Sequence, residues 1–152
     1  MREETSRAWR EVDLSALAHN ARVLQGALAP GCRLMSVVKA DAYGHGSIPV
    51  ARRLEAEGVK AFAVACLEEG IALRQSGVQG KILILCYTPP GMAFHICRWK
   101  LVQTVVDEDH GRALAAQGVP LSVHLALDTG MHRLSIPVED HEAISLCMNC
   151  PI

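Results

Sequence analysis

The densest group of chemically useful side chains lies between residues 37 and 47, which read Val-Val-Lys-Ala-Asp-Ala-Tyr-Gly-His-Gly-Ser. Lys39 follows a run of apolar and small residues, so we expect its amine to be partly desolvated. Desolvation favours the neutral amine, the nucleophile that condenses with a carbonyl group to form a Schiff base. Tyr43 adds a hydroxyl, and Gly44 and Gly46 let the backbone approach an anion beside a helix N-terminus. The alternative is a surface lysine beside an ordinary glycine turn.

Other residue types with possible chemistry are weaker candidates. Cys147 and Cys150 have the spacing of a zinc or redox pair, with His141 nearby, but a second pair of ligands is missing. We therefore expect no metal site there. Three histidines show no ligand spacing and are predicted to be surface or capping residues: His19, His95 and His110.

The elements that must position Lys39 follow from hydrophobic periodicity. Leucine and alanine recur every three or four residues over 14–28, which predicts a helix with Asp13 as its N-cap. Residues 8–12 are interpreted as a short edge strand. Short, continuously apolar runs then alternate with helical stretches, which is typical of parallel strands covered on both faces. These runs are Leu34–Val38, Ala61–Cys66, Ile82–Cys86, Leu101–Val106 and Leu121–Leu127.

A small repeat supports this reading. Gly58-Val59, Gly77-Val78 and Gly118-Val119 each follow a helical stretch and precede an apolar run. Glycine can take the left-handed conformation that ends a helix, and the valine then turns inward. Ser47 is predicted to cap the helix that follows the Lys39 segment. Repeated helix–strand units place Lys39 at the carboxyl end of a strand, where α/β folds carry their active sites.

Composition excludes several classes of function. The chain has 152 residues, a net charge of -1 and only 4% aromatic residues, so a nucleic-acid surface with a basic excess and stacking rings is not expected. The N-terminus lacks the apolar stretch of a secretory signal, and no apolar run approaches the length of a membrane span. These features predict a cytoplasmic protein.

Two motifs carry a resemblance to a known family. Residues 37–46 resemble the cofactor-lysine motif of the alanine racemases, which are pyridoxal-phosphate (PLP) enzymes with an N-terminal (β/α)8 barrel. Residues 128–134, Asp-Thr-Gly-Met-His-Arg-Leu, resemble the family's second motif. The histidine in it is closest to serine/alanine racemases of the vancomycin-resistance type. The resemblance runs from about residue 8 to the C-terminus.

The resemblance implies a fold and its boundaries. A complete barrel needs about 250 residues, so this chain would hold about five of eight β/α units of a partial TIM-like barrel. Residues 1–32 would form a strand and helix leading into the barrel, and residues 33–152 its first, truncated part. The family's C-terminal β domain would be absent.

The resemblance also assigns roles to particular residues. Lys39 would be the Schiff-base lysine for pyridoxal 5'-phosphate and the base on one face of an alanine or serine substrate. Tyr43 would hydrogen-bond the cofactor phosphate, and Arg133 would orient the substrate carboxylate. Two departures affect Arg133: Ala126 stands where many relatives have a modified lysine that pairs with this arginine, and Ser135 replaces a usual glycine.

The predicted function is thus the N-terminal part of an amino-acid racemase that supplies D-amino acids for cell-wall precursors. The full-length parent would be a homodimer, and the isolated chain would be inactive because the family's second base, a tyrosine of the C-terminal domain, is missing. Two alternatives stay open: a PLP-binding homeostasis protein without racemase activity, and an inactive truncated fragment. The sequence does not choose between alanine and serine, nor exclude a membrane-anchored parent whose cytoplasmic domain this would be.

Overall fold

The computed structural model of the chain describes residues 8–150. Its main strands are β1 (Met35–Val37), β2 (Ala61–Val64), β3 (Lys81–Ile84), β4 (Val102–Val105) and β5 (Ser122–Leu125). They form one parallel sheet in the order of the chain, β1-β2-β3-β4-β5. A second, two-stranded parallel pair joins β6 (Leu127–Asp128) to β7 (Ile136–Pro137). Every predicted apolar run therefore overlaps a strand.

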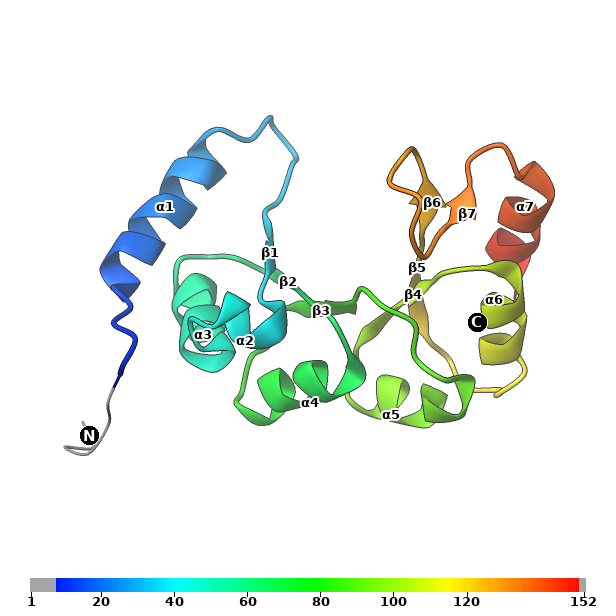
Figure 1. Ribbon diagram of the computed structural model, residues 1–152, viewed down its shortest axis with the longest axis horizontal. Coiled ribbons are helices and arrows are strands. Elements are labelled where there is room, and N and C mark those ends of the chain that lie inside the picture. Colours follow the sequence, from blue (N-terminus) through cyan, green and yellow to red (C-terminus); the bar gives the residue numbers. More distant parts are fainter. Residues whose placement is uncertain (1–7, 151–152) are drawn as a thin grey trace.

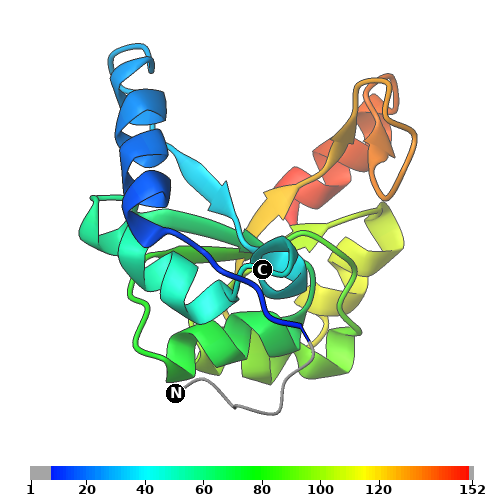
Figure 2. The same cartoon turned by 60° about the vertical axis from the view of Figure 1, so that its left-hand side comes forward.

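Helices connect and cover these strands. They are α1 (Leu14–Gly26), α2 (Lys39–Tyr43), α3 (Ser47–Ala56), α4 (Leu67–Gln75), η1 (Pro90–Met92), α5 (Ala93–Arg98), α6 (Glu108–Ala115) and α7 (His141–Asn149). In Figures 1 and 2 the sheet is curved and open, and α1 and α7 stand at its two ends. The predicted α/β class is confirmed, and the arrangement is that of part of a (β/α) barrel.

The predicted N-terminal strand is not present, because residues 8–12 form no strand in the structure. The chain reaches α1 as irregular backbone instead. Asp13 caps α1 as predicted, because its carboxylate accepts the N–H groups of Ser15 at 2.7 Å and Ala16 at 3.2 Å. Helix α1 then packs on α3, where Arg22 donates to the Glu57 carboxylate at 2.6 Å.

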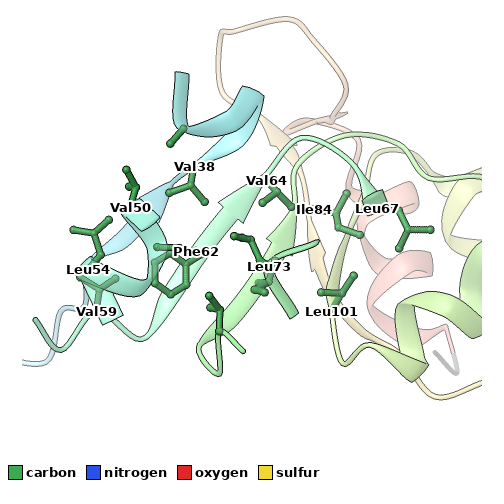
Figure 3. Packing of buried hydrophobic residues seen from close by; sticks show 14 of the residues in the cluster. Val38, Val50, Leu54, Val59, Phe62, Val64, Leu67, Leu73, Ile84 and Leu101 are labelled. Carbon is green, nitrogen blue, oxygen red and sulfur yellow. The ribbon is translucent and has the colours of Figure 1, made fainter. Parts of the chain in front are cut away.

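The core lies where β1–β3 meet α3 and α4. Phe62, Leu73 and Ile84 are fully buried in this cluster, which Figure 3 shows from close by. The three predicted Gly-Val pairs end helices as expected: the glycines have φ of 88°, 95° and 66°, at positions 58, 77 and 118. Val59 and Val78 are buried behind them. Each pair thus joins a helix to the next strand of the sheet.

Burial is uneven across the sheet. Residues of β2 and β3 are buried on both faces, as continuously apolar strands predict. The marginal strands β1 and β5 instead alternate between exposed and half-buried residues. The apolar stripe of α1 is also only partly covered, since Leu24 is 56% exposed. No helix within residues 8–150 is long and apolar enough to cross a membrane.

Candidate active site

Lys39 lies directly beyond the carboxyl end of β1, as predicted. The preceding residue, Val38, is buried and donates its N–H to the Ala63 carbonyl at 2.8 Å, which extends the pairing of β1 with β2. The Lys39 side chain is half-buried. The pairing of β1 with β2 thus fixes the backbone that leads into Lys39, while the residue itself stays partly exposed.

The residues after Lys39 have an unusual backbone. Ala40, Asp41, Ala42 and Tyr43 have φ between 50° and 54°, and Gly44 follows at 86°. A left-handed conformation costs about 1–2 kcal/mol per non-glycine residue, and runs of it are rare. Sequence reasoning did not predict this left-handed turn, because only Gly44 and Gly46 favour positive φ. Such strain is retained where surrounding contacts enforce it, and it is concentrated at functional sites.

Hydrogen bonds inside the segment hold the left-handed turn. The Ala42 N–H donates to the Val38 carbonyl at 2.9 Å, and the Gly44 N–H donates to the Ala40 carbonyl at 3.0 Å. Tyr43, at the end of the turn, projects outward with 61% of its surface exposed. Its hydroxyl is therefore accessible to a ligand.

Asp41 caps the helix that follows the turn. Its Oδ1 accepts the Ser47 N–H at 2.7 Å, while its other oxygen lies 4.0 Å from the Arg10 guanidinium. The prediction that Ser47 caps α3 is wrong: Gly46 occupies the N-cap position and provides no side chain, so the carboxylate of Asp41 substitutes for it. The left-handed turn brings Asp41 back to the helix N-terminus, which a sequence pattern does not reveal.

Glu69 of α4 is a site residue that the sequence did not indicate. Its Oε1 accepts the Ala40 N–H and its Oε2 accepts the Ala65 N–H, both at 2.7 Å. These donors follow the carboxyl ends of β1 and β2. The only sequence signal is an acidic pair, Glu68-Glu69, in the first turn of a helix, which the helix dipole explains equally well.

The second motif forms a tight loop between β6 and β7. Asp128 accepts the N–H groups of Gly130 at 2.9 Å and His132 at 3.0 Å, and its other oxygen faces the His132 ring at 3.0 Å. The backbone donors, His132 first and then Gly130, lower the pKa of Asp128. Arg133 is exposed and makes no hydrogen bond or ion pair with another residue of the described range. Its guanidinium is therefore free to bind an anion.

Both motifs follow the carboxyl ends of strands, but one lies beside the first strand of the sheet and the other beside the last. Lys39 and Tyr43 follow β1, whereas Arg133 lies in the loop that follows β5 and β6. Parallel strands direct all their carboxyl ends to one edge, so the three residues share that edge. Their convergence on one small ligand stays a prediction.

The weaker candidates from the sequence are the possible metal ligands, Cys147 and His110. Within residues 8–150, no group of three or more His, Cys, Asp or Glu side chains is arranged to hold a metal ion. Burial raises the pKa of the Cys147 thiol, so this cysteine is not activated as a nucleophile. His110, predicted to be a surface or capping residue, is in fact buried and donates from Nε2 to the Thr88 carbonyl at 3.0 Å.

Comparison with known proteins identifies the family. A model of the family described as alanine racemase, N-terminal domain, matches residues 12–151. The chain belongs to this family. Among curated relatives, it is 45% identical over 141 residues to an amino-acid racemase of Enterococcus faecalis. It is 45% identical over 130 residues to a serine/alanine racemase of Enterococcus gallinarum. An alanine racemase of Desulfovibrio desulfuricans is 40% identical over 143 residues.

Solved alanine racemases share the fold. The structure of the Clostridium difficile alanine racemase in complex with cycloserine superposes with a TM-score of 0.87 at 33% identity, covering 96% of this chain and 41% of that one. The histidine racemase of Leuconostoc mesenteroides superposes with a TM-score of 0.81 at 27% identity, covering 89% of this chain and 37% of that one.

The chain is short beside its curated relatives. The matched region covers 93% of this chain but 20% of the Enterococcus faecalis protein, and 91% of this chain but 38% of the Desulfovibrio desulfuricans enzyme. The chain thus corresponds to part of the alanine racemase N-terminal domain, with both motifs inside the matched region.

Proposed function

We propose that this chain carries the cofactor-lysine half of the active site of a PLP-dependent racemase that acts on alanine or serine. The observation that supports this is the placement of Lys39: a half-buried lysine at the carboxyl end of β1, followed by a strained turn that several hydrogen bonds hold. One relative whose name includes both substrates is the serine/alanine racemase of Enterococcus gallinarum.

The residues present fit the chemistry of pyridoxal 5'-phosphate. The cofactor offers an aldehyde and a phosphate, and this edge of the sheet offers a primary amine at Lys39 and an exposed hydroxyl at Tyr43. Lys39 would hold the cofactor through its amine, and Tyr43 would donate to the phosphate. When bound, the cofactor supplies an electron sink for the carbanion at the substrate Cα.

The protein's own groups would then control removal and return of the proton on the substrate Cα. When it is not holding the cofactor, the Lys39 amine would remove or return the proton on one face. Arg133, exposed and without an ion-pair partner in the described range, would bind the substrate carboxylate in the bidentate geometry that suits guanidinium. Inversion needs a second base on the opposite face. We propose that another chain segment or subunit provides it, as in a homodimeric parent enzyme.

A labelling experiment tests the role of Lys39. The 152-residue chain is incubated with pyridoxal 5'-phosphate and reduced with borohydride, and the modified peptide is mapped by mass spectrometry. We expect the phosphopyridoxyl label on Lys39, because its amine is the one held at the carboxyl edge of the sheet. Lys39→Ala should lose the label.

The matched control is Lys81→Ala, because Lys81 is exposed at the start of β3, at the opposite edge of the sheet. This variant should keep the label on Lys39 at the level of the unchanged chain. Equal labelling of Lys39 and Lys81 in the unchanged chain would contradict the proposal, since it would show only surface amine chemistry.

A further inference from the structure

The carboxylate of Glu69 joins two neighbouring loops at the candidate site. Each of its oxygens accepts one backbone N–H at 2.7 Å, from Ala40 in the left-handed turn and from Ala65 beyond β2. Glu69 is half-buried in the first turn of α4. Hydrogen bonds to an ionised acceptor are about twice as strong as neutral ones, and this arrangement uses two of them.

The left-handed turn needs such an acceptor. Its internal bonds begin with the Ala42 N–H, which donates to Val38, so the Ala40 N–H lies too early in the turn to have a partner inside it. Val38 occupies the N-cap position, and its apolar side chain cannot accept a hydrogen bond from the Ala40 N–H. Glu69 therefore caps this turn from another helix, as an N-cap residue caps an ordinary helix.

The bond acts on Lys39 through the peptide plane. The Ala40 N–H belongs to the same planar unit as the Lys39 carbonyl, so fixing the N–H direction fixes the ψ angle of Lys39. The second oxygen connects this peptide to Ala65, which follows the buried strand β2. The direction in which the Lys39 side chain leaves the backbone is thus tied to the carboxyl end of the buried strand β2.

We propose that Glu69 is a positioning residue that holds Lys39 in place for its reaction with a carbonyl group. This rests on the proposed function of Lys39. Glu69 does not touch the reacting atoms; it acts through the Ala40 peptide. Loss of its carboxylate should release the Lys39 segment locally while leaving the core of β2, β3 and α4 intact.

Three variants test the proposal on the full chain. Glu69→Gln keeps one acceptor oxygen and so can hold only one of the two N–H groups, whereas Glu69→Ala holds neither. Glu68→Gln is the matched control, because it removes the same charge from the same helix turn at an exposed position that no hydrogen bond joins to Ala40. Circular dichroism first checks that each variant is folded.

The first measurement is amide hydrogen exchange, which does not depend on any cofactor. In Glu69→Ala we expect the Ala40 and Ala65 amides to exchange about tenfold faster or more, since each loses a charge-assisted bond. Amides within β3 should be unchanged, and Glu68→Gln should match the original chain throughout. Unchanged exchange at Ala40 in Glu69→Ala would overturn the proposal.

The second measurement is the initial rate of phosphopyridoxyl labelling at Lys39, relative to the rate at the exposed Lys81. We expect this ratio to fall severalfold in Glu69→Ala, to be partly restored in Glu69→Gln and to be unaffected in Glu68→Gln. Faster amide exchange with an unchanged labelling ratio would overturn the positioning role. If the original chain shows no preference for Lys39, the proposed function fails, and amide exchange alone then decides the role of Glu69.

If the variants do not fold, amide exchange in the original chain tests the proposal. In the original chain, Ala40 is an exposed residue, and among the described residues 8–150 its N–H is bonded to Glu69. Slow exchange of this amide would support the proposal, and exchange as fast as in an unstructured peptide would overturn it.

Discussion

His110 is a single residue whose surroundings link its charge to the stability of the chain. Its ring is 3% exposed, its Nε2 donates to the Thr88 carbonyl at 3.0 Å, and the Val106 N–H faces its Nδ1 at 3.5 Å. Both contacts suit the neutral ring with its proton on Nε2. Burial lowers the pKa of His110, against the opposing effects of the Thr88 carbonyl and the Asp107 charge.

This environment predicts a pH dependence of stability. Because the pKa of His110 is lower in the folded chain than in the unfolded chain, the unfolded state binds the proton more readily. Stability should be full above the ordinary histidine pKa of about 6.5 and should fall as the pH drops below it. Urea unfolding between about pH 8 and pH 5 measures the effect.

A matched pair of variants assigns that dependence to one ring. His110→Gln should remove much of the loss between about pH 6.5 and pH 5, whereas His95→Gln, at an exposed position, should retain it. A loss of the same size in both variants would show that other groups are responsible.

At the level of elements, the junction between β2 and β3 depends on a close backbone approach. Gly80 immediately precedes β3, and its N–H donates to the Glu55 carboxylate at 2.7 Å. Arg74 donates to the Gly80 carbonyl at 2.7 Å, so the position is held from both sides. A Cβ added at Gly80 would lie 2.9 Å from the Lys60 carbonyl oxygen and 3.0 Å from the Phe62 ring.

Gly80→Ala should therefore destabilise the chain. The added methyl group meets backbone, which cannot move without shifting β2, so we expect a loss of about 1–3 kcal/mol in the free energy of unfolding. Gly26→Ala is the control, because a Cβ there meets nothing within 4 Å at the end of α1. It should stabilise the chain by about 0.5–1 kcal/mol. Chemical denaturation of both variants gives the comparison, and equal effects would contradict the role of the close contact.

At the level of the whole molecule, the margin of the sheet at β1 is apolar and open. The outer margin of β1 pairs with no strand of the described range. Met35 and Val37 of β1 are 37% and 42% exposed, and a groove of about 620 Å³ separates the strand from α1. Exposed strand edges and apolar patches promote association between chains.

We therefore expect the chain to associate in a concentration-dependent way. Sedimentation velocity over a range of concentrations should show species larger than a monomer, and Met35→Lys should shift the distribution towards the monomer because it places a charge on the open edge. Met148→Lys is the control, since Met148 is 73% exposed on α7, away from that edge. A monomer at all concentrations would contradict this expectation.

The repeated units of this fold and the identity of its chemical groups follow from local patterns in the amino-acid sequence. The apolar runs predicted all five strands of the sheet, because the burial of a strand leaves a pattern that is local in the sequence. The pattern is clearest in β2 and β3, which are buried on both faces. The Gly-Val pairs predicted helix ends because this signal is local too: the positive φ at Gly58 and Gly77 depends on glycine itself. The motif around Lys39 predicted the family, which the comparisons confirm.

How these groups are held depends instead on contacts between distant parts of the chain. The left-handed turn after Lys39 contains alanine, aspartate and tyrosine, whose own preferences oppose positive φ. It is held because Glu69 accepts the Ala40 N–H from outside the turn, while Asp41 within the turn accepts the Ser47 N–H of α3. Glu69 lies 29 residues from Ala40 in the sequence, and His110 lies 22 residues from Thr88. Contacts at such separations leave no local pattern, because they depend on which strands and helices the fold brings side by side.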